Sequence, residues 1–228
     1  MNVRARVGLR AASPIDTVHD PDCTRCARLE AHLGRIRRAH PGYFCRPVPP
    51  FGVDLPELLV VGLAPGLHGA NASGRPFTGD HAGILLYQTL FDFGFASRPQ
   101  STGAGDGLDL IRCRITNAVK CLPPANKPLP EEVRTCNAYL RNEIGRLPSR
   151  AVVLALGRIA HDAVLRASDA GIKDHPFAHG TMHVLPSGRR LVASYHCSRY
   201  NTQTHRLTPK MFREVFQHIK SLLNRGPA

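Results

Sequence analysis

The sequence has no apolar run that approaches the roughly 18 residues needed to cross a bilayer. Its first residues, 1–23, are basic but have no apolar centre, which a secretory signal would need. It also has no internal repeat and no low-complexity tract. We therefore expect a cytoplasmic protein without a membrane partner, in which residues 1–20 form a flexible basic arm and residues 21–224 form a single domain.

Acidic residues are scarce relative to basic ones. The 228 residues include 30 Lys and Arg against 17 Asp and Glu, which gives a formal net charge of +13. Such a balance favours a polyanionic partner, because each phosphate that is neutralised releases condensed counterions. Charge alone does not separate DNA from RNA or from an acidic protein, so the nature of the partner depends on the site.

The seven cysteines are an odd number, whereas a secreted disulfide framework typically has an even one. Cys23 and Cys26 form a C-x-x-C pair, a spacing that serves zinc, iron–sulfur and redox sites alike. Cys121 follows a predicted strand and Cys136 lies in the next predicted helix, so four thiolates would tie the N-terminal helix to the sheet. The alternative is that Cys136 is an ordinary buried residue. The remaining cysteines are interpreted as free thiols: Cys45, Cys113 and Cys197.

Short apolar segments alternate with helical patterns along the chain. The predicted strands are 58–63, 114–120, 151–157 and 190–196. The predicted helices are 23–41, 81–94, one that begins at Pro130, 158–171 and 208–226. Alternation of this kind is typical of an α/β fold with a mostly parallel sheet and helices on both faces.

In such sheets the functional residues collect where the strands end. Four loops therefore become candidates: 64–80, 121–129, 157–158 and 196–207. The second and fourth are rich in amide and hydroxyl side chains, which predicts a hydrogen-bonding pocket. The alternative is that Asn126, Asn201 and Thr202 only supply turns and caps.

The stretch "LLVVGLAPGLHGANASGRPFTGD" (58–80) ends an apolar run in a glycine-rich loop that closes on Asp80. No Lys-Ser or Lys-Thr follows a glycine, which argues against a P-loop for nucleotide phosphates. Asp80 is also a suitable N-cap for the helix that follows, and Phe77 could be part of the core. Three arginines of the candidate loops are interpreted as solvated surface charges rather than phosphate contacts: Arg75, Arg199 and Arg206.

Three motifs, "GLAPGLHGANASGRPFTGD", "VKCLPPANKPLPEEVRTC" and "SYHCSRYNTQTHRLT", together resemble the family-five (type B) uracil-DNA glycosylases. The resemblance runs from about Cys23 to about Lys220. It implies a three-layer α/β/α sandwich around a central four-stranded parallel sheet, acting as a monomer. It also implies a [4Fe–4S] cluster with the following ligands: Cys23, Cys26, Cys121 and Cys136.

The same resemblance assigns the site. Asp80 matches the acid that orients or activates the attacking water, and His196 the histidine beside O2 of the base. Phe77 matches the aromatic residue on which the base stacks and Asn126 the amide that reads the base, and Asn201 matches an amide further along the loop that carries His196. The implied activity is removal of uracil, and of deaminated purines such as hypoxanthine and xanthine, from DNA by base flipping. No lysine matches a Schiff-base nucleophile, so lyase activity is not expected.

Two other function classes fit part of the sequence. A non-catalytic iron–sulfur module that binds nucleic acid would explain the charge and the cysteines, but not the acid, amide and histidine of the loops. A hydrolase of free nucleotides would use the glycine loop, yet paired acids for Mg²⁺ are absent. The loop at Asn71-Ala72-Ser73 also departs from the Asn-Arg-Thr common in the family and so lacks one positive charge.

Overall fold

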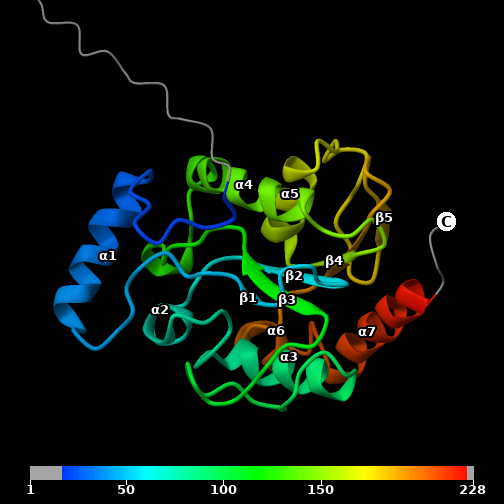
Figure 1. The fold of residues 1–228 in the computed structure, drawn as a ribbon, viewed down its shortest axis with the longest axis horizontal. Helices are drawn as coiled ribbons and strands as arrows, with labels where there is room; N and C mark the ends of the chain where they lie inside the picture. The colour runs from blue at the N-terminus through cyan, green and yellow to red at the C-terminus, as the bar shows by residue number, and fades with distance from the viewer. Residues whose placement is uncertain (1–16, 225–228) are drawn as a thin grey trace, which may run out of the picture.

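The computed structural model describes residues 17–224, so most of the predicted arm (1–16) lies outside the described residues. A twisted six-stranded sheet runs through the molecule and has helices on both faces (Figure 1). Within residues 17–224, no helix is long and apolar enough to cross a membrane.

The centre of the sheet is made of parallel strands. These are β3 (Cys113–Asn117), β2 (Leu58–Gly62), β4 (Val152–Leu156) and β6 (Arg190–Ser194), in this spatial order. Every residue of β2, β3 and β4 is buried, as expected for parallel strands that are covered on both faces. The four predicted strands and their parallel arrangement are therefore confirmed.

One short antiparallel strand is added at each edge of the sheet. β1 (Phe51–Gly52) pairs with β3, and β5 (Met182–Val184) pairs with β6. These two strands were not predicted from the sequence. They are two and three residues long and partly exposed, so they show no apolar run.

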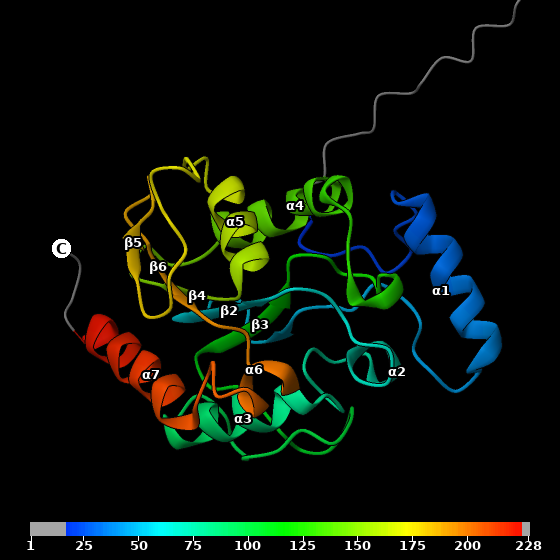
Figure 2. The ribbon, with the colours of Figure 1, turned by 180° about the vertical axis from the view of Figure 1, so that it is seen from behind.

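The helices form two layers, one above and one below the sheet in both Figures 1 and 2. The longer ones are α1 (Ala27–Ala39), α3 (His81–Asp92), α4 (Pro130–Gly145), α5 (Arg158–Ala167) and α7 (Pro209–Asn224). All five were predicted. Some predicted ends were too long: α5 stops at Ala167 rather than 171, because Asp169 takes a left-handed backbone conformation with φ of 55°.

The alternation of side chains in β2 divides the core between the two layers. Leu59 and Val61 point to the cluster built by α4, α5 and α1, whereas Leu58 and Val60 point to the cluster built by α3 and α7. Successive residues of a strand face opposite sides, so one five-residue strand anchors both layers. The predicted three-layer α/β/α sandwich is confirmed.

Short helical turns occupy the loops at the carboxyl ends of the parallel strands. They are α2 (Ala70–Ser73), the 3₁₀ turn η1 (Pro124–Asn126) and α6 (Arg199–Gln203). Parallel strands end at the same edge, so these loops converge. α6 lies next to α3 in both views (Figures 1 and 2).

Candidate active site

One cavity at the carboxyl edge of the sheet brings together four of the five predicted base-binding and catalytic residues. Phe77 and Asp80 reach it from the first loop, Asn126 from the second and His196 from the end of β6. Its volume is about 480 Å³, within the range of small-molecule sites. The convergence follows from the parallel sheet, which brings loops far apart in sequence to one place.

Asp80 takes the N-cap position of α3, but its carboxylate does not cap that helix. The backbone carbonyl of Asp80 accepts a hydrogen bond from the Gly83 N–H at 3.0 Å, whereas its Oδ2 accepts one from the Ala70 N–H at 3.4 Å. Burial raises the pKa of Asp80 above its ordinary value of 3.8. The helix-cap interpretation thus accounts for the backbone of Asp80 and leaves the carboxylate at the cavity.

Two glycines of the loop make room for this carboxylate. A Cβ atom on Gly69 would lie 1.9 Å from Asp80 Oδ1, and one on Gly66 would lie 2.6 Å from the same oxygen. Real Cβ atoms do not approach other atoms so closely. The sequence analysis could not have assigned this role, because it depends on where the far end of the loop returns.

Phe77 forms a wall of the cavity and also belongs to the core between the sheet and α3. Its ring stacks on the His196 ring, with the centroids 5.9 Å apart and an angle of 26° between the planes. The backbone of Phe77 is left-handed, with φ of 58°, which is costly for a bulky residue. The surrounding contacts therefore impose this conformation. A Cβ on Gly83 would lie 1.8 Å from the Phe77 carbonyl oxygen.

Burial lowers the pKa of His196 to about 4, so its imidazole is neutral at pH 7. A neutral imidazole still carries one N–H that can donate to an oxygen. Asn201 holds the backbone of this residue, because its Nδ2 donates to the His196 carbonyl oxygen at 2.8 Å. Asn201 does not line the cavity with Asp80. It lines a neighbouring cavity of about 430 Å³, together with Arg158 and Arg206.

Amide side chains stand at two points of the first cavity. Asn126, at the end of η1, has a left-handed backbone with φ of 56°, which asparagine tolerates better than most residues. Asn117, at the end of β3, also lines the cavity and is only 4% exposed. Asn117 was not predicted from the sequence. The available signal was an amide at the carboxyl end of a predicted strand.

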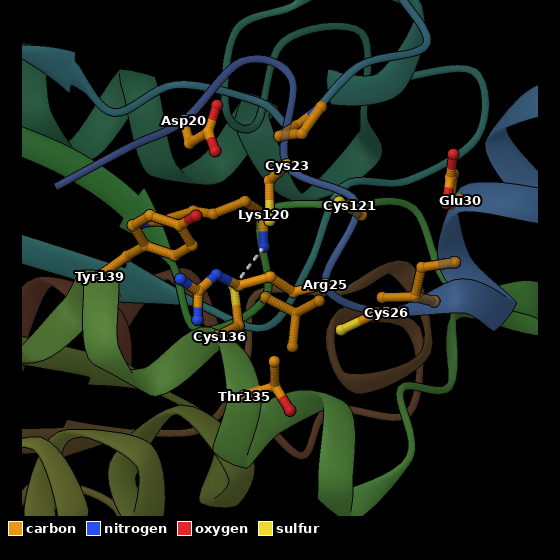
Figure 3. Close-up of a pocket in the computed structure, with 13 residues that line it drawn as sticks. Asp20, Cys23, Arg25, Cys26, Glu30, Lys120, Cys121, Thr135, Cys136 and Tyr139 are labelled. Carbon is orange, nitrogen blue, oxygen red and sulfur yellow. Dashed lines mark hydrogen bonds between the residues drawn. The ribbon is translucent and has the colours of Figure 1, made fainter. Parts of the chain in front are cut away.

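The four predicted cluster ligands line a second site, about the start of α1 (Figure 3). Cys23 and Cys26 come from the N-terminal side of α1, Cys121 from the loop after β3 and Cys136 from α4. All four are free thiols. Among residues 17–224, no set of three or more His, Cys, Asp or Glu side chains is arranged to hold a metal ion. The structure therefore gathers the four residues around one cavity without forming a coordination shell.

The surroundings of these thiols bear on their chemistry. Burial, together with the neighbouring Cys136, raises the pKa of Cys26 to about 11. Burial and the other thiols likewise raise the pKa of Cys121. Cys136 Sγ accepts a hydrogen bond from the Lys120 N–H at 3.3 Å, drawn as a dashed line in Figure 3. This one N–H donor would suit a charged thiolate at Cys136, and the four cysteines around one cavity fit the ligand set of an iron–sulfur cluster.

Comparison with known proteins decides the family. The model of the uracil DNA glycosylase superfamily matches residues 49–220, three quarters of the chain and the whole first cavity. The chain belongs to this superfamily. Relatives named type-5 uracil-DNA glycosylases match this chain over most of their own length, which indicates the type-5 branch of the superfamily. This glycosylase is therefore a hydrolase of N-glycosyl bonds.

The relatives come from distant organisms. A type-5 uracil-DNA glycosylase of Thermus thermophilus is 49% identical over 206 residues, which cover 88% of this chain and 93% of the relative. One from Mycobacterium bovis is 43% identical over 210 residues, covering 88% and 78%. One from Pyrobaculum aerophilum is 41% identical over 200 residues, covering 86% and 87%. The resemblance stated from the three motifs is confirmed.

The environment of the Arg75 side chain differs from the one predicted from the sequence. We interpreted it as a solvated surface charge, but it is 8% exposed and its Nη1 lies 2.8 Å from Asp106 Oδ1. That interpretation was wrong. The partner lies 31 residues further along the chain, so no local pattern indicated it. The Asn71-Ala72-Ser73 stretch, which lacks the positive charge common in the family, falls in α2, where Asn71 is buried and donates to Cys45 Sγ at 3.5 Å.

Proposed function

We propose that this glycosylase removes uracil from DNA by hydrolysing the N-glycosidic bond, leaving an abasic site in an intact strand. The observation that carries the proposal is one cavity in which a partly buried carboxylate, a neutral imidazole, an aromatic wall and an amide meet. The relatives are named type-5 uracil-DNA glycosylases, which supports uracil as the base and DNA repair as the process.

The side chains divide the chemistry between the two products. Breaking the bond develops positive charge on the sugar and negative charge on the base. Asp80 would hold the water at the sugar and oppose the oxocarbenium charge, as carboxylates do in glycoside hydrolysis. His196 would donate its N–H to O2 of the departing base, and such a donor is worth about 3–4 kcal/mol. Phe77 would stack on the base, and Asn126 would read its edge.

Reaching this cavity requires the base to leave the helical stack. Extrusion costs a few kcal/mol and is cheapest for a mispaired base. Tyr200 on α6 is 70% exposed, so a large aromatic side chain stands at the loop that carries His196. Such a side chain could occupy the space that the base leaves. Nearby, the guanidinium groups of Arg158 and Arg206 stack on Phe177 and Tyr195, which supports a path for the DNA backbone.

We further propose that Cys23, Cys26, Cys121 and Cys136 hold a [4Fe–4S] cluster. Bound there, the cluster would act as a cross-link between α1, the loop after β3 and α4. The four free thiols around one cavity support this, as does the N–H donor from Lys120. Four cysteines are the usual ligand set of such clusters.

The proposal also covers the extent of the domain, its oligomeric state, its location and the other bases that it removes. We propose one domain over residues 21–224, acting as a monomer in the cytoplasm, and activity on hypoxanthine and xanthine besides uracil. A cavity of about 480 Å³ has room for a two-ring base, which supports the wider substrate range. DNA oligomers carrying one hypoxanthine or one xanthine test that range directly.

A labelled oligomer with a single uracil tests the main proposal. The protein is expected to create an alkali-labile site at the uracil, with no strand break before alkali. His196→Ala is expected to lower the single-turnover rate about 10²–10³-fold, the usual cost of a lost oxyanion donor. Lys173→Ala, at an exposed residue that lines neither cavity, is the control. A cluster-loaded protein that binds all these oligomers and cleaves none would favour the non-catalytic module.

The pH dependence of base release is expected to show a limb on the acid side and a plateau above it. Asp80 acts as the anion, and burial raises its pKa above 3.8, so activity falls as the pH drops through that raised value. His196, with a pKa of about 4, remains neutral over most of this range. The measurement is kcat/KM from about pH 4 to pH 9. An acid limb near the ordinary pKa of histidine that disappears in His196→Gln would contradict the assignment.

A further inference from the structure

The loop at 97–107 is fixed to the loop that carries Phe77. The Arg75 guanidinium donates to Asp106 Oδ1 at 2.8 Å and to Ser101 Oγ at 3.0 Å. Thr78 Oγ1 lies 2.6 Å from the same Ser101 hydroxyl. Since Arg75 and Thr78 are both buried, these contacts join the two loops below the surface. The loop at 97–107 is therefore preformed next to the active site.

Asp106 organises the loop and has its charge compensated within it. Its carboxylate accepts backbone N–H bonds from Thr102 at 2.8 Å, Gly103 at 3.3 Å and Leu108 at 3.0 Å, besides the bond from Arg75. The acid of this loop is thus turned inward and neutralised. Two exposed side chains of the loop, Gln100 and Thr102, are polar and uncharged, and its exposed Arg98 donates through Nε to the Gly107 carbonyl oxygen at 3.2 Å.

Between this loop and α3 lies a cavity of about 460 Å³. From the loop it is lined by Gln100, Ser101 and Thr102. On the other side it shares four residues with the cavity that holds the base: Phe77, Asp80, His81 and Arg199. The two cavities are therefore neighbours separated by the catalytic acid and the stacking wall. A nucleotide in the first cavity would have to pass its backbone along such a surface.

One cation on the shared wall has unused capacity for an anion. The Arg199 side chain is exposed and forms no ion pair within residues 17–224. Together with the hydroxyl of Thr102 and the amide of Gln100, it places hydrogen-bond donors on both sides of the cavity. Donors on both sides with one cation fit a phosphodiester, which carries a single charge and several acceptor oxygens.

We propose that this cavity binds the phosphodiester on one side of the damaged nucleotide, between Arg199 and the loop at 97–107. This inference rests on the proposed activity on DNA. It assigns Gln100 and Thr102 as backbone-binding residues and gives the Arg75–Asp106 pair the task of holding them in place. Binding of this kind positions the strand without reading its sequence.

The test uses single-turnover cleavage of uracil oligomers in which one phosphodiester at a time is replaced by an uncharged methylphosphonate. At one flanking position, the replacement is expected to raise the half-saturating concentration of the wild-type enzyme about tenfold. The variant Gln100→Ala/Thr102→Val and the variant Arg199→Ala are each expected to show a similar rise on the unmodified oligomer. In neither variant should replacing that same phosphodiester by a methylphosphonate raise the half-saturating concentration further. Lys173→Ala removes an exposed cation elsewhere and controls for net charge.

Two results would overturn the inference and they can be told apart. If the wild type cleaves the unmodified oligomer, but each variant is as sensitive to every flanking methylphosphonate as the wild type is, the phosphate lies elsewhere and only this inference fails. If the wild type cleaves none of the uracil oligomers, the proposed function fails and this inference fails with it. The inference is supported if both variants lose the effect of methylphosphonate replacement at the same single phosphodiester. Misfolding would lower affinity for every oligomer and would not remove the effect at one linkage alone.

Discussion

Asp80→Asn is expected to lower the single-turnover rate of uracil release about 10²–10⁴-fold. The amide keeps the shape of the carboxylate, so it fits the space left by Gly66 and Gly69 and can still accept the bond from the Ala70 N–H. It cannot take a proton from water or oppose positive charge on the sugar. Affinity for a DNA oligomer with an abasic site should remain within a few-fold of the wild type.

The same variant is expected to be more stable than the wild type at neutral pH. Burial raises the pKa of Asp80, so the unfolded chain ionises this acid more readily than the folded protein does. The folded state therefore carries a free-energy cost that appears as the pH rises through the pKa that Asp80 has in the unfolded chain. The Asn variant removes this cost. Each 1 kcal/mol gained would raise the Tm by about 2–4 °C in a protein of this size. Asp109→Asn, at an exposed acid, is the control. An unchanged single-turnover rate of uracil release in Asp80→Asn would rule out the role of the Asp80 carboxylate at the attacking water.

Cys121→Ser is expected to remove the proposed cluster and much of the stability. The wild type should be brown, with broad visible absorbance and about four irons per chain. Metal binding adds to the free energy of folding where the site joins distant segments, and Cys121 joins the loop after β3 to α1 and α4. We expect the variant to be colourless and its Tm to fall by more than about 10 °C.

Cys113→Ala provides the matched control, because Cys113 is also buried but lies in β3, away from the four-cysteine cavity. It should retain its iron and lose only the modest stability of a small core truncation. Iron content by mass spectrometry and thermal unfolding, both after purification without oxygen, make the comparison. A colourless wild type that holds one zinc per chain would refute the cluster.

The central sheet could be predicted because its strands are short apolar segments bounded by glycine, proline or polar residues. β2 and β4 are buried along their whole length, so hydrophobicity alone marks them. β1 and β5 depend on pairing with a neighbour rather than on their own residues, and no local signal indicates them. The same holds for the buried pair of Arg75 and Asp106, whose members lie on separate loops.

The candidate site was predictable to the extent that it follows from the motifs. Phe77, Asp80, Asn126 and His196 converge because parallel strands end at one edge of the sheet. Their assigned chemical roles stay predictions until the variants are measured. What the sequence did not indicate is how each group is held. The stacking of Phe77 on His196 and the bond from Asn201 to the His196 carbonyl both depend on the tertiary arrangement.

The space that Gly66 and Gly69 leave for the Asp80 carboxylate has a consequence for how this enzyme can be lost in evolution. One added methyl group at position 69 would overlap the Asp80 carboxylate, and a single nucleotide change turns a glycine codon into an alanine codon. The product of such a change would keep every acid, amide, histidine and cysteine of the family. It would still carry the positive charge that draws it to DNA, and so could occupy damaged sites without repairing them. An inventory of reactive side chains would count that descendant as an active enzyme.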